Sequence, residues 1–211
     1  LVPVERLAIV GTGLIGASVA LAAKQAGVES VSGFDPDSHA LEVAAERGAV
    51  DRPASSLVDA LADAELAVVA APVTQIAAQV SAAIDASPET CTVTDVGSTK
   101  AAACSAAGSS ARFVGGHPVC GSEARGPEHA SGELFQGATW FLTPLAGTDA
   151  ERYRLVHGFV SDLGATPVAI DPDTHDRHVA VTSHLPHALA NMLVNQAGST
   201  RIERHDPLLA A

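Results

Sequence analysis

The stretch Gly11-Thr12-Gly13-Leu14-Ile15-Gly16 decides the fold, because it joins an apolar run at residues 6–10 to an uncharged helical pattern that begins at residue 14. In the spacing G-x-G-x-x-G the first glycine allows a tight turn and the second lets a phosphate approach the backbone. The third lets the helix pack closely on the strand. The N-terminus of the helix adds N–H donors and a favourable dipole for an anion. We therefore predict that these six residues bind a dinucleotide.

An acidic residue at the expected distance supports this prediction. Asp35 lies 19 residues after Gly16, at the end of a predicted strand over 30–34. A carboxylate there can accept hydrogen bonds from the ribose hydroxyls of an adenosine and would repel a 2′-phosphate, so NAD is favoured over NADP. Pro72 follows a third predicted strand, and it either lies beside a ribose of the cofactor or simply ends the strand.

Apolar runs alternate with helical patterns along most of the chain. The predicted strands are 6–10, 30–34, 66–70, 92–96, 112–115 and 139–143, and the predicted helices between them are 14–26, 37–47, 74–84 and 99–106. Such alternation is typical of a parallel sheet covered by helices on both faces. We predict an α/β fold with a Rossmann-type, doubly wound, mostly parallel sheet.

The pattern changes at Asp171-Pro172-Asp173, which is typical of a helix start. A helical pattern then continues to about Gln196, with Pro186 as a possible kink inside it. We expect an NAD-binding domain over 1–170. Residues 171–211 are too few to bury a core of their own, so we expect them to form the first helix or helices of a truncated all-helical dimerisation or substrate domain.

The composition limits the classes of partner. Hydrophobic residues make up 47% of the 211 residues but aromatic residues only 3%, which predicts a core of Ala, Val, Leu and Ile. The net charge of −12 argues against nucleic acid and against an anionic membrane surface. Three cysteines without a C-x-x-C pattern favour a reducing cytoplasm over a secreted, disulfide-bonded protein.

Two polar segments follow predicted strands, where ligands of open parallel sheets bind. In Asp95-Val96-Gly97-Ser98-Thr99-Lys100 the hydroxyls of Ser98 and Thr99 stand where a helix N-cap would be. Either hydroxyl could serve as a cap alone, or could cap the next helix and still face a ligand. The cations Lys100 and Arg125 could offset substrate charge, but we interpret them first as solvated surface residues.

The second segment contains His117, between two glycines and Pro118. A histidine with an ordinary pKa of about 6.5 can accept a proton at neutral pH. A purely structural role for a loop histidine remains open, and so does a less favoured nucleophilic role for Cys120.

Four stretches together resemble the prephenate dehydrogenase family, which includes arogenate and cyclohexadienyl dehydrogenases. They are Gly11 to Gly16, Asp95 to Lys100, Gly116-His117-Pro118-Val119-Cys120-Gly121-Ser122-Glu123, and Ser183-His184-Leu185-Pro186-His187. The resemblance covers essentially the whole chain in order. It implies an NAD-dependent oxidative decarboxylation of prephenate to 4-hydroxyphenylpyruvate, or of arogenate to tyrosine, in tyrosine biosynthesis.

The resemblance also implies roles for single residues. His117 would be the catalytic base, and Ser98 would hydrogen-bond both the reacting hydroxyl and His117. The implied substrate-binding residues are Ser122, Glu123, His184 and His187. It further implies a homodimer formed through the helical domain. No metal is expected, because the histidines between residues 175 and 187 lack further ligands.

The sequence also departs from the family. Cys120 replaces the usual alanine, and Arg201 follows His184 at about half the family's spacing to a substrate-binding arginine, so we expect Arg201 to be an unrelated loop residue. A 3-hydroxyacid-type dehydrogenase is one alternative, although no lysine follows Lys100 to serve as its catalytic residue. The other alternative is an NAD-binding sensing module without turnover.

Overall fold

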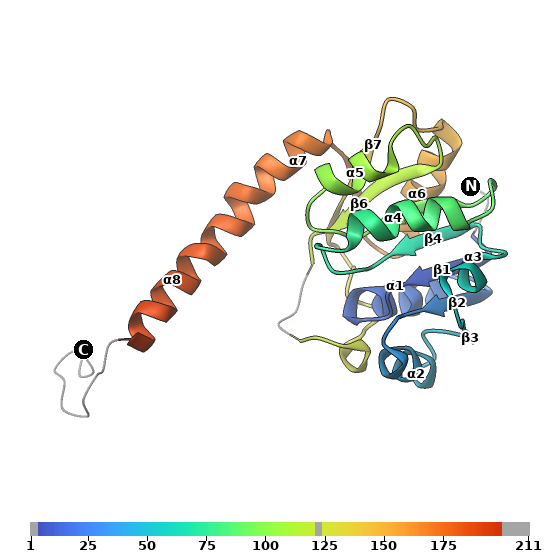
Figure 1. The fold of residues 1–211 in the computed structure, drawn as a ribbon, viewed down its shortest axis with the longest axis horizontal. Coiled ribbons are helices and arrows are strands. Elements are labelled where there is room, and N and C mark those ends of the chain that lie inside the picture. The colour runs from blue at the N-terminus through green and yellow to red at the C-terminus, as the bar shows by residue number, and fades with distance from the viewer. Residues whose placement is uncertain (1–3, 121–123, 200–211) are drawn as a thin grey trace. The chain divides into compact units, whose positions relative to one another are not determined.

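The computed structural model describes residues 4–120 and 124–199, with side chains to residue 196. Its sheet has eight strands in the order β3-β2-β1-β4-β5-β6-β7-β8 (Figure 1). The strands are β1 (Arg6–Val10), β2 (Ser30–Phe34), β3 (Arg52–Pro53), β4 (Leu66–Val69), β5 (Thr92–Asp95), β6 (Phe113–Pro118), β7 (Thr139–Pro144) and β8 (Thr166–Ala169).

Neighbouring strands are parallel except for β6 and β7, which form an antiparallel pair. The order of the first six strands, 3-2-1-4-5-6, is that of doubly wound dinucleotide-binding sheets. The predicted α/β fold class is therefore confirmed. The change of direction between β1 and β4 creates the switch point at which such sheets bind ligands.

Helices cover both faces of the sheet. They are α1 (Leu14–Gln25), α2 (Ser38–Glu46), α3 (Leu57–Leu61), α4 (Ile76–Ala86), α5 (Ala101–Ala107) and α6 (Ala150–Asp162), with a short 3-10 helix η1 (Pro127–His129). Helices α1, α2 and α6 contribute to one hydrophobic cluster and α3, α4 and α5 to the other. In Figure 1, α4 and α5 lie side by side on their face.

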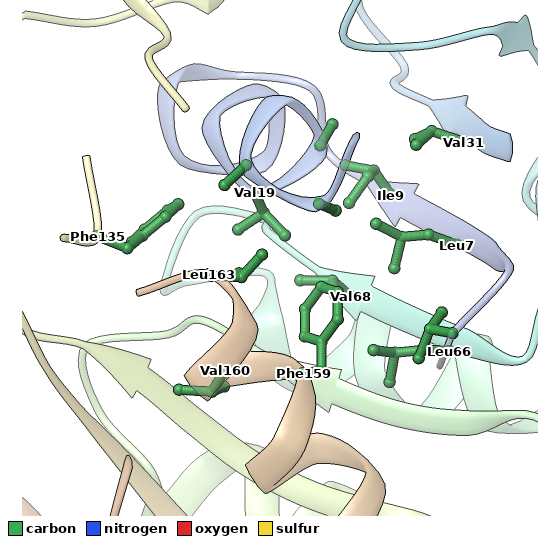
Figure 2. Close-up of a cluster of buried hydrophobic side chains, with 14 of the residues drawn as sticks. Leu7, Ile9, Val19, Val31, Leu66, Val68, Phe135, Phe159, Val160 and Leu163 are labelled. Carbon is green, nitrogen blue, oxygen red and sulfur yellow. The ribbon is translucent and has the colours of Figure 1, made fainter. Parts of the chain in front are cut away.

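Strand β1 shows why the sheet needs this double cover. Its side chains alternate between the two clusters: Leu7 and Ile9 belong to the first, and Ala8 and Val10 to the second. All four are at most 3% exposed. Figure 2 shows the first cluster, in which Leu7 and Ile9 lie with side chains of α1, such as Val19, and of α6, such as Phe159. Because both faces of a central strand are buried, its sequence is a continuous apolar run rather than an alternating one.

Small side chains bring α1 close to the sheet. Ala17, Ala20 and Ala23 are completely buried along one side of this helix. The core consists mostly of Ala, Val, Leu and Ile, as the composition predicted, and Trp140 is the largest fully buried side chain. Close packing of this kind leaves little freedom in how the glycine turn before α1 is placed.

The C-terminal helical segment consists of α7 (Pro172–Val179), a π-helical turn η2 (Ala180–His184) and α8 (Leu185–Ser199). The predicted helix start is confirmed, because the Asp171 carboxylate accepts a hydrogen bond of 2.9 Å from the Thr174 N–H. Near Pro186 the helix contains the π turn, in which the Leu185 N–H donates to the Ala180 carbonyl. A proline has no N–H for the usual bond to the fourth residue before it, and a π turn accommodates that loss.

The chain divides into two compact units, Leu1–His175 and Asp176–Ala211. Within the described residues, no helix combines the length and the apolar character needed to cross a bilayer.

Candidate active site

A cavity of about 480 Å³ opens at the glycine turn. Among its lining residues are six that the sequence singles out for cofactor binding: Gly11, Gly13, Leu14, Ile15, Asp35 and Pro72. It lies at the carboxyl ends of β1, β2 and β4, at the switch point of the sheet. The seventh predicted residue, Gly16, lies beneath the turn rather than at the cavity wall.

Each glycine of the turn has the geometry that its predicted role requires. Gly11 has φ +97°, and a Cβ there would lie 2.6 Å from the Ala70 carbonyl oxygen. A Cβ on Gly16 would lie only 1.9 Å from the Gly11 carbonyl oxygen. At Gly13 a Cβ would meet nothing within 4 Å, and this residue caps α1 without a side-chain hydrogen bond. The backbone at Gly13 and the start of α1 therefore border open space in the cavity, and a helix N-terminus is a favourable place for an anion.

The Asp35 carboxylate is held in place at the edge of this cavity. It accepts hydrogen bonds from the backbone N–H of Thr12, at 2.6 Å, and of Asp37, at 2.9 Å. These bonds link the end of β2 to the glycine turn and orient the carboxylate before any ligand binds. Arg125, an exposed residue in the segment between β6 and β7, also lines the cavity.

A buried ion pair joins the ends of β5 and β6. The Lys100 ammonium binds the Asp95 carboxylate and donates to the Gly116 carbonyl, and both charged side chains are completely buried. Asp95 also accepts hydrogen bonds from the N–H groups of Gly97, at 2.8 Å, and Gly116, at 3.0 Å. The interpretation of Lys100 as a solvated surface cation is wrong, since its ammonium closes a network between two strands.

Ser98 lies in the loop that wraps around the Asp95 carboxylate, and its side chain is half-buried. Helix α5 begins only at Ala101, with Lys100 as its N-cap and no capping side-chain bond. The alternative in which Ser98 or Thr99 caps the helix is therefore wrong. The Ser98 hydroxyl lies just beyond the carboxyl end of β5, where a ligand-facing role remains available.

His117 lies on a strand rather than in a loop. The predicted fifth strand ended at residue 115, but β6 continues to Pro118 because its last residues pair with β7, with His117 opposite Phe141. The His117 ring is half-buried, and its Nδ1 lies 2.8 Å from Nε2 of His175. Since β6 is parallel to β5, His117 lies at the same sheet edge as Ser98 and the glycine turn.

The sequence did not reveal His175 as a neighbour of His117. His175 is completely buried in α7, and it is separated from His117 by 58 residues. The one available signal was the helix start at Asp171, which fixes His175 one turn into a helix that follows the edge strand β8.

The remaining predicted site residues are placed as follows. Ser122 and Glu123 lie outside the described residues, and so does Arg201, which was expected to be an unrelated loop residue. His184 and His187 belong to the second unit, where both are exposed, and His187 Nδ1 lies 2.9 Å from the Ser183 carbonyl oxygen.

A nucleophilic role for Cys120 and a metal site are two further chemical possibilities. Burial raises the pKa of the Cys120 thiol to about 11, which keeps it protonated at neutral pH and argues against a nucleophilic role. Across the described residues, no group of three His, Cys, Asp or Glu side chains has the arrangement of a metal site.

These features define a class of protein. An open sheet of this order, with a glycine turn and an acidic residue around a cavity at its switch point, is a dinucleotide-binding α/β domain. The family model for the prephenate dehydrogenase nucleotide-binding domain matches residues 19–169, and the model for the prephenate dehydrogenase dimerization domain matches residues 171–210. The chain belongs to the prephenate dehydrogenase family.

Individual relatives agree with this assignment. The chain is 32% identical to prephenate dehydrogenase of Bacillus subtilis (strain 168), over 91% of this chain and 53% of that protein. It superimposes with a TM-score of 0.83 on prephenate dehydrogenase from A. aeolicus in complex with hydroxyphenyl propionate and NAD+, at 31% identity over 91% of this chain and 68% of that one.

A third relative differs in its stated activity. Synechocystis arogenate dehydrogenase has a TM-score of 0.80 and 30% identity, over 93% of this chain and 70% of that one. The chain spans about half the length of the first curated relatives that it matches.

Proposed function

We propose that this chain forms the NAD-binding and proton-accepting part of an enzyme that oxidatively decarboxylates prephenate, or arogenate, in tyrosine biosynthesis. The observation that carries the proposal is the position of His117. Its imidazole lies at the carboxyl edge of the sheet that carries the glycine turn, and only a base at that edge can serve a ligand bound in the cavity.

The residues present fit an NAD molecule. The backbone of Gly11 to Gly16 and the first turn of α1 would hold the pyrophosphate, and Asp35 would accept hydrogen bonds from the adenosine ribose. Pro72 would lie against the cofactor at the end of β4. Bound NAD supplies the hydride acceptor for an alcohol oxidation.

His117 supplies the proton acceptor. As hydride leaves the carbinol carbon of the substrate, the imidazole would take the proton of the hydroxyl group, and Ser98 would orient that hydroxyl by a hydrogen bond. His117 then becomes a cation beside a dianionic substrate. A charge that develops only during the reaction stabilises the transition state more than the ground state.

We assign substrate binding to Ser122, Glu123, His184 and His187, following the family resemblance. We also propose a homodimer formed through the helices after residue 171. Apolar side chains of α8 such as Leu189, Met192 and Leu193 are more than half exposed in this chain. Such exposure is expected of residues that contact the second subunit of a dimer. None of the three described cysteines forms a disulfide, which fits the proposed location in the cytoplasm.

Steady-state kinetics test the proposed function. Prephenate or arogenate with NAD should yield NADH and carbon dioxide, and the ratio of kcat/KM for the two substrates identifies the preferred one. His117→Ala should bind NAD normally and lose most of kcat, whereas the exposed His157→Ala should resemble the wild type. Near-normal kcat in His117→Ala would refute the base assignment. Binding of NAD without turnover of either substrate would favour a sensing module instead.

A further inference from the structure

His117 and His175 form a pair of imidazoles that the proposed reaction does not itself require. Their rings meet edge to face, with centroids 5.0 Å apart and an interplanar angle of 79°. The short contact joins Nδ1 of His117 to Nε2 of His175, at 2.8 Å. This distance is that of a hydrogen bond, so one nitrogen carries the shared proton and the other accepts it.

The His175 ring is itself held in a fixed orientation. It is completely buried, and it also makes an edge-to-face contact with the Phe141 ring, with centroids 5.3 Å apart. Phe141 lies directly opposite His117 in the β6–β7 pair. The His175 backbone N–H donates to the Asp171 carbonyl at 2.8 Å, which anchors the residue in α7. A nitrogen presented so rigidly can select one geometry of its partner.

We propose that His175 is a positioning residue that fixes the tautomer of His117. In this arrangement Nδ1 of His117 carries a proton and its N–H donates a hydrogen bond to Nε2 of His175, so that Nε2 of His117 keeps its lone pair. The inference rests on the proposed function in one respect only: a base needs an unprotonated nitrogen for the substrate hydroxyl.

Proton counting excludes the reverse arrangement for a base. If His175 Nε2 donated to His117, the single proton of a neutral His117 would lie on its Nε2, and that nitrogen could not accept another. With His117 as the donor, proton transfer from the substrate makes an imidazolium whose Nδ1–H is still paired with His175. That bond becomes charge-assisted and stronger as the reaction proceeds. His175 therefore serves both the orientation of the base and the stabilisation of its product.

The tautomer can be measured without any turnover. Two-bond ¹H–¹⁵N correlation spectra of imidazole-labelled protein distinguish protonated from unprotonated ring nitrogens, and loss of signals in His117→Asn assigns the ring. Wild-type His117 should show a protonated Nδ1 and an unprotonated Nε2 at a pH where it is neutral. His175→Leu should release this preference, and His175→Gln, whose amide oxygen accepts a hydrogen bond, should restore much of it.

Kinetics on the same variants provide the functional readout. His175→Leu should lower kcat about 100-fold while KM for NAD changes less than about twofold, because the partner that orients a histidine acts on chemistry rather than on cofactor binding. His175→Gln should recover about tenfold of that loss. His157→Leu, at an exposed histidine of α6, is the matched control and should leave both measurements unchanged.

The outcomes separate this inference from the proposed function. A protonated Nε2 on wild-type His117, or unchanged tautomer and kcat in His175→Leu, would overturn the role of His175 even if the enzyme turned over. A tautomer shift in a protein that oxidises neither substrate would support the role of His175 and refute the function. Should His175→Leu fail to fold, the wild-type spectrum and His175→Gln still decide the question.

Discussion

Replacing Lys100 by methionine should destabilise the protein strongly. Methionine retains the approximate length of lysine but not its charge, so the completely buried Asp95 carboxylate would keep only the N–H groups of Gly97 and Gly116 as partners. Breaking a buried ion pair on one side costs about 3–5 kcal/mol. Because native proteins are stable by about 5–15 kcal/mol, Lys100→Met should lose about a fifth or more of the free energy of unfolding.

Equilibrium unfolding in urea measures this loss. Asp95→Asn in the Lys100→Met background should recover part of it, because a neutral amide costs less to bury than an unpaired carboxylate. The control is Lys24→Met, which removes the ion pair to Asp51 at a site where both side chains are about one-third exposed. Such a surface pair contributes about 0–1 kcal/mol. A loss below about 1 kcal/mol in Lys100→Met, or purely additive effects in the double variant, would refute this reasoning.

Three further predictions concern the cavity and its surroundings. Gly13→Ala should keep the melting temperature but weaken NAD binding in a calorimetric titration, whereas Gly16→Ala, whose Cβ would meet the Gly11 carbonyl at 1.9 Å, should lower the melting temperature as well. Asp35→Asn should weaken NAD binding about 10- to 100-fold, as expected for loss of a charged hydrogen-bond acceptor, and an unchanged Kd would exclude a ribose contact. Burial raises the pKa of Cys120 from 9.0 to about 11, so alkylation of this thiol should be slow at pH 7 and accelerate up to pH 11; rapid alkylation at pH 7 would contradict the burial.

The central strands were predictable because the burial of a strand shows in its local sequence. Strand β1 has the predicted bounds, since a strand buried on both faces is an apolar run. Strand β2 also has the predicted bounds, although its sequence includes two serines and a glycine. Strand β8, at the edge of the sheet, was missed because it is largely exposed and includes Pro167. Strand β3 has only two residues, too few to leave a pattern. Helix α6 was also missed, since charged residues fill its first turns.

The lining of the cavity at the glycine turn was predictable for a similar reason. Its glycines and Asp35 follow one another at a fixed spacing along the chain, which the sequence shows directly. The contacts around His117 depend instead on residues distant in sequence: Lys100 reaches Gly116, and His175 reaches His117 across 58 positions. Such contacts exist only after the sheet and α7 have formed, so local sequence patterns do not show them. For this reason Lys100 was predicted to be a solvated surface residue, and His175 was not predicted to contact His117.

The antiparallel pairing of β6 and β7 has an evolutionary consequence. A parallel crossover would have returned the polypeptide to the opposite rim of the sheet, but this pairing keeps the residues between Pro118 and Thr139 anchored at both ends on the ligand side. Part of this segment, around Arg125, lines the cavity at the glycine turn. Insertions or substitutions in this segment can change selectivity for the ligand while the hydrogen bonds between β6 and β7 stay intact. This segment is therefore a natural place for related enzymes to diverge.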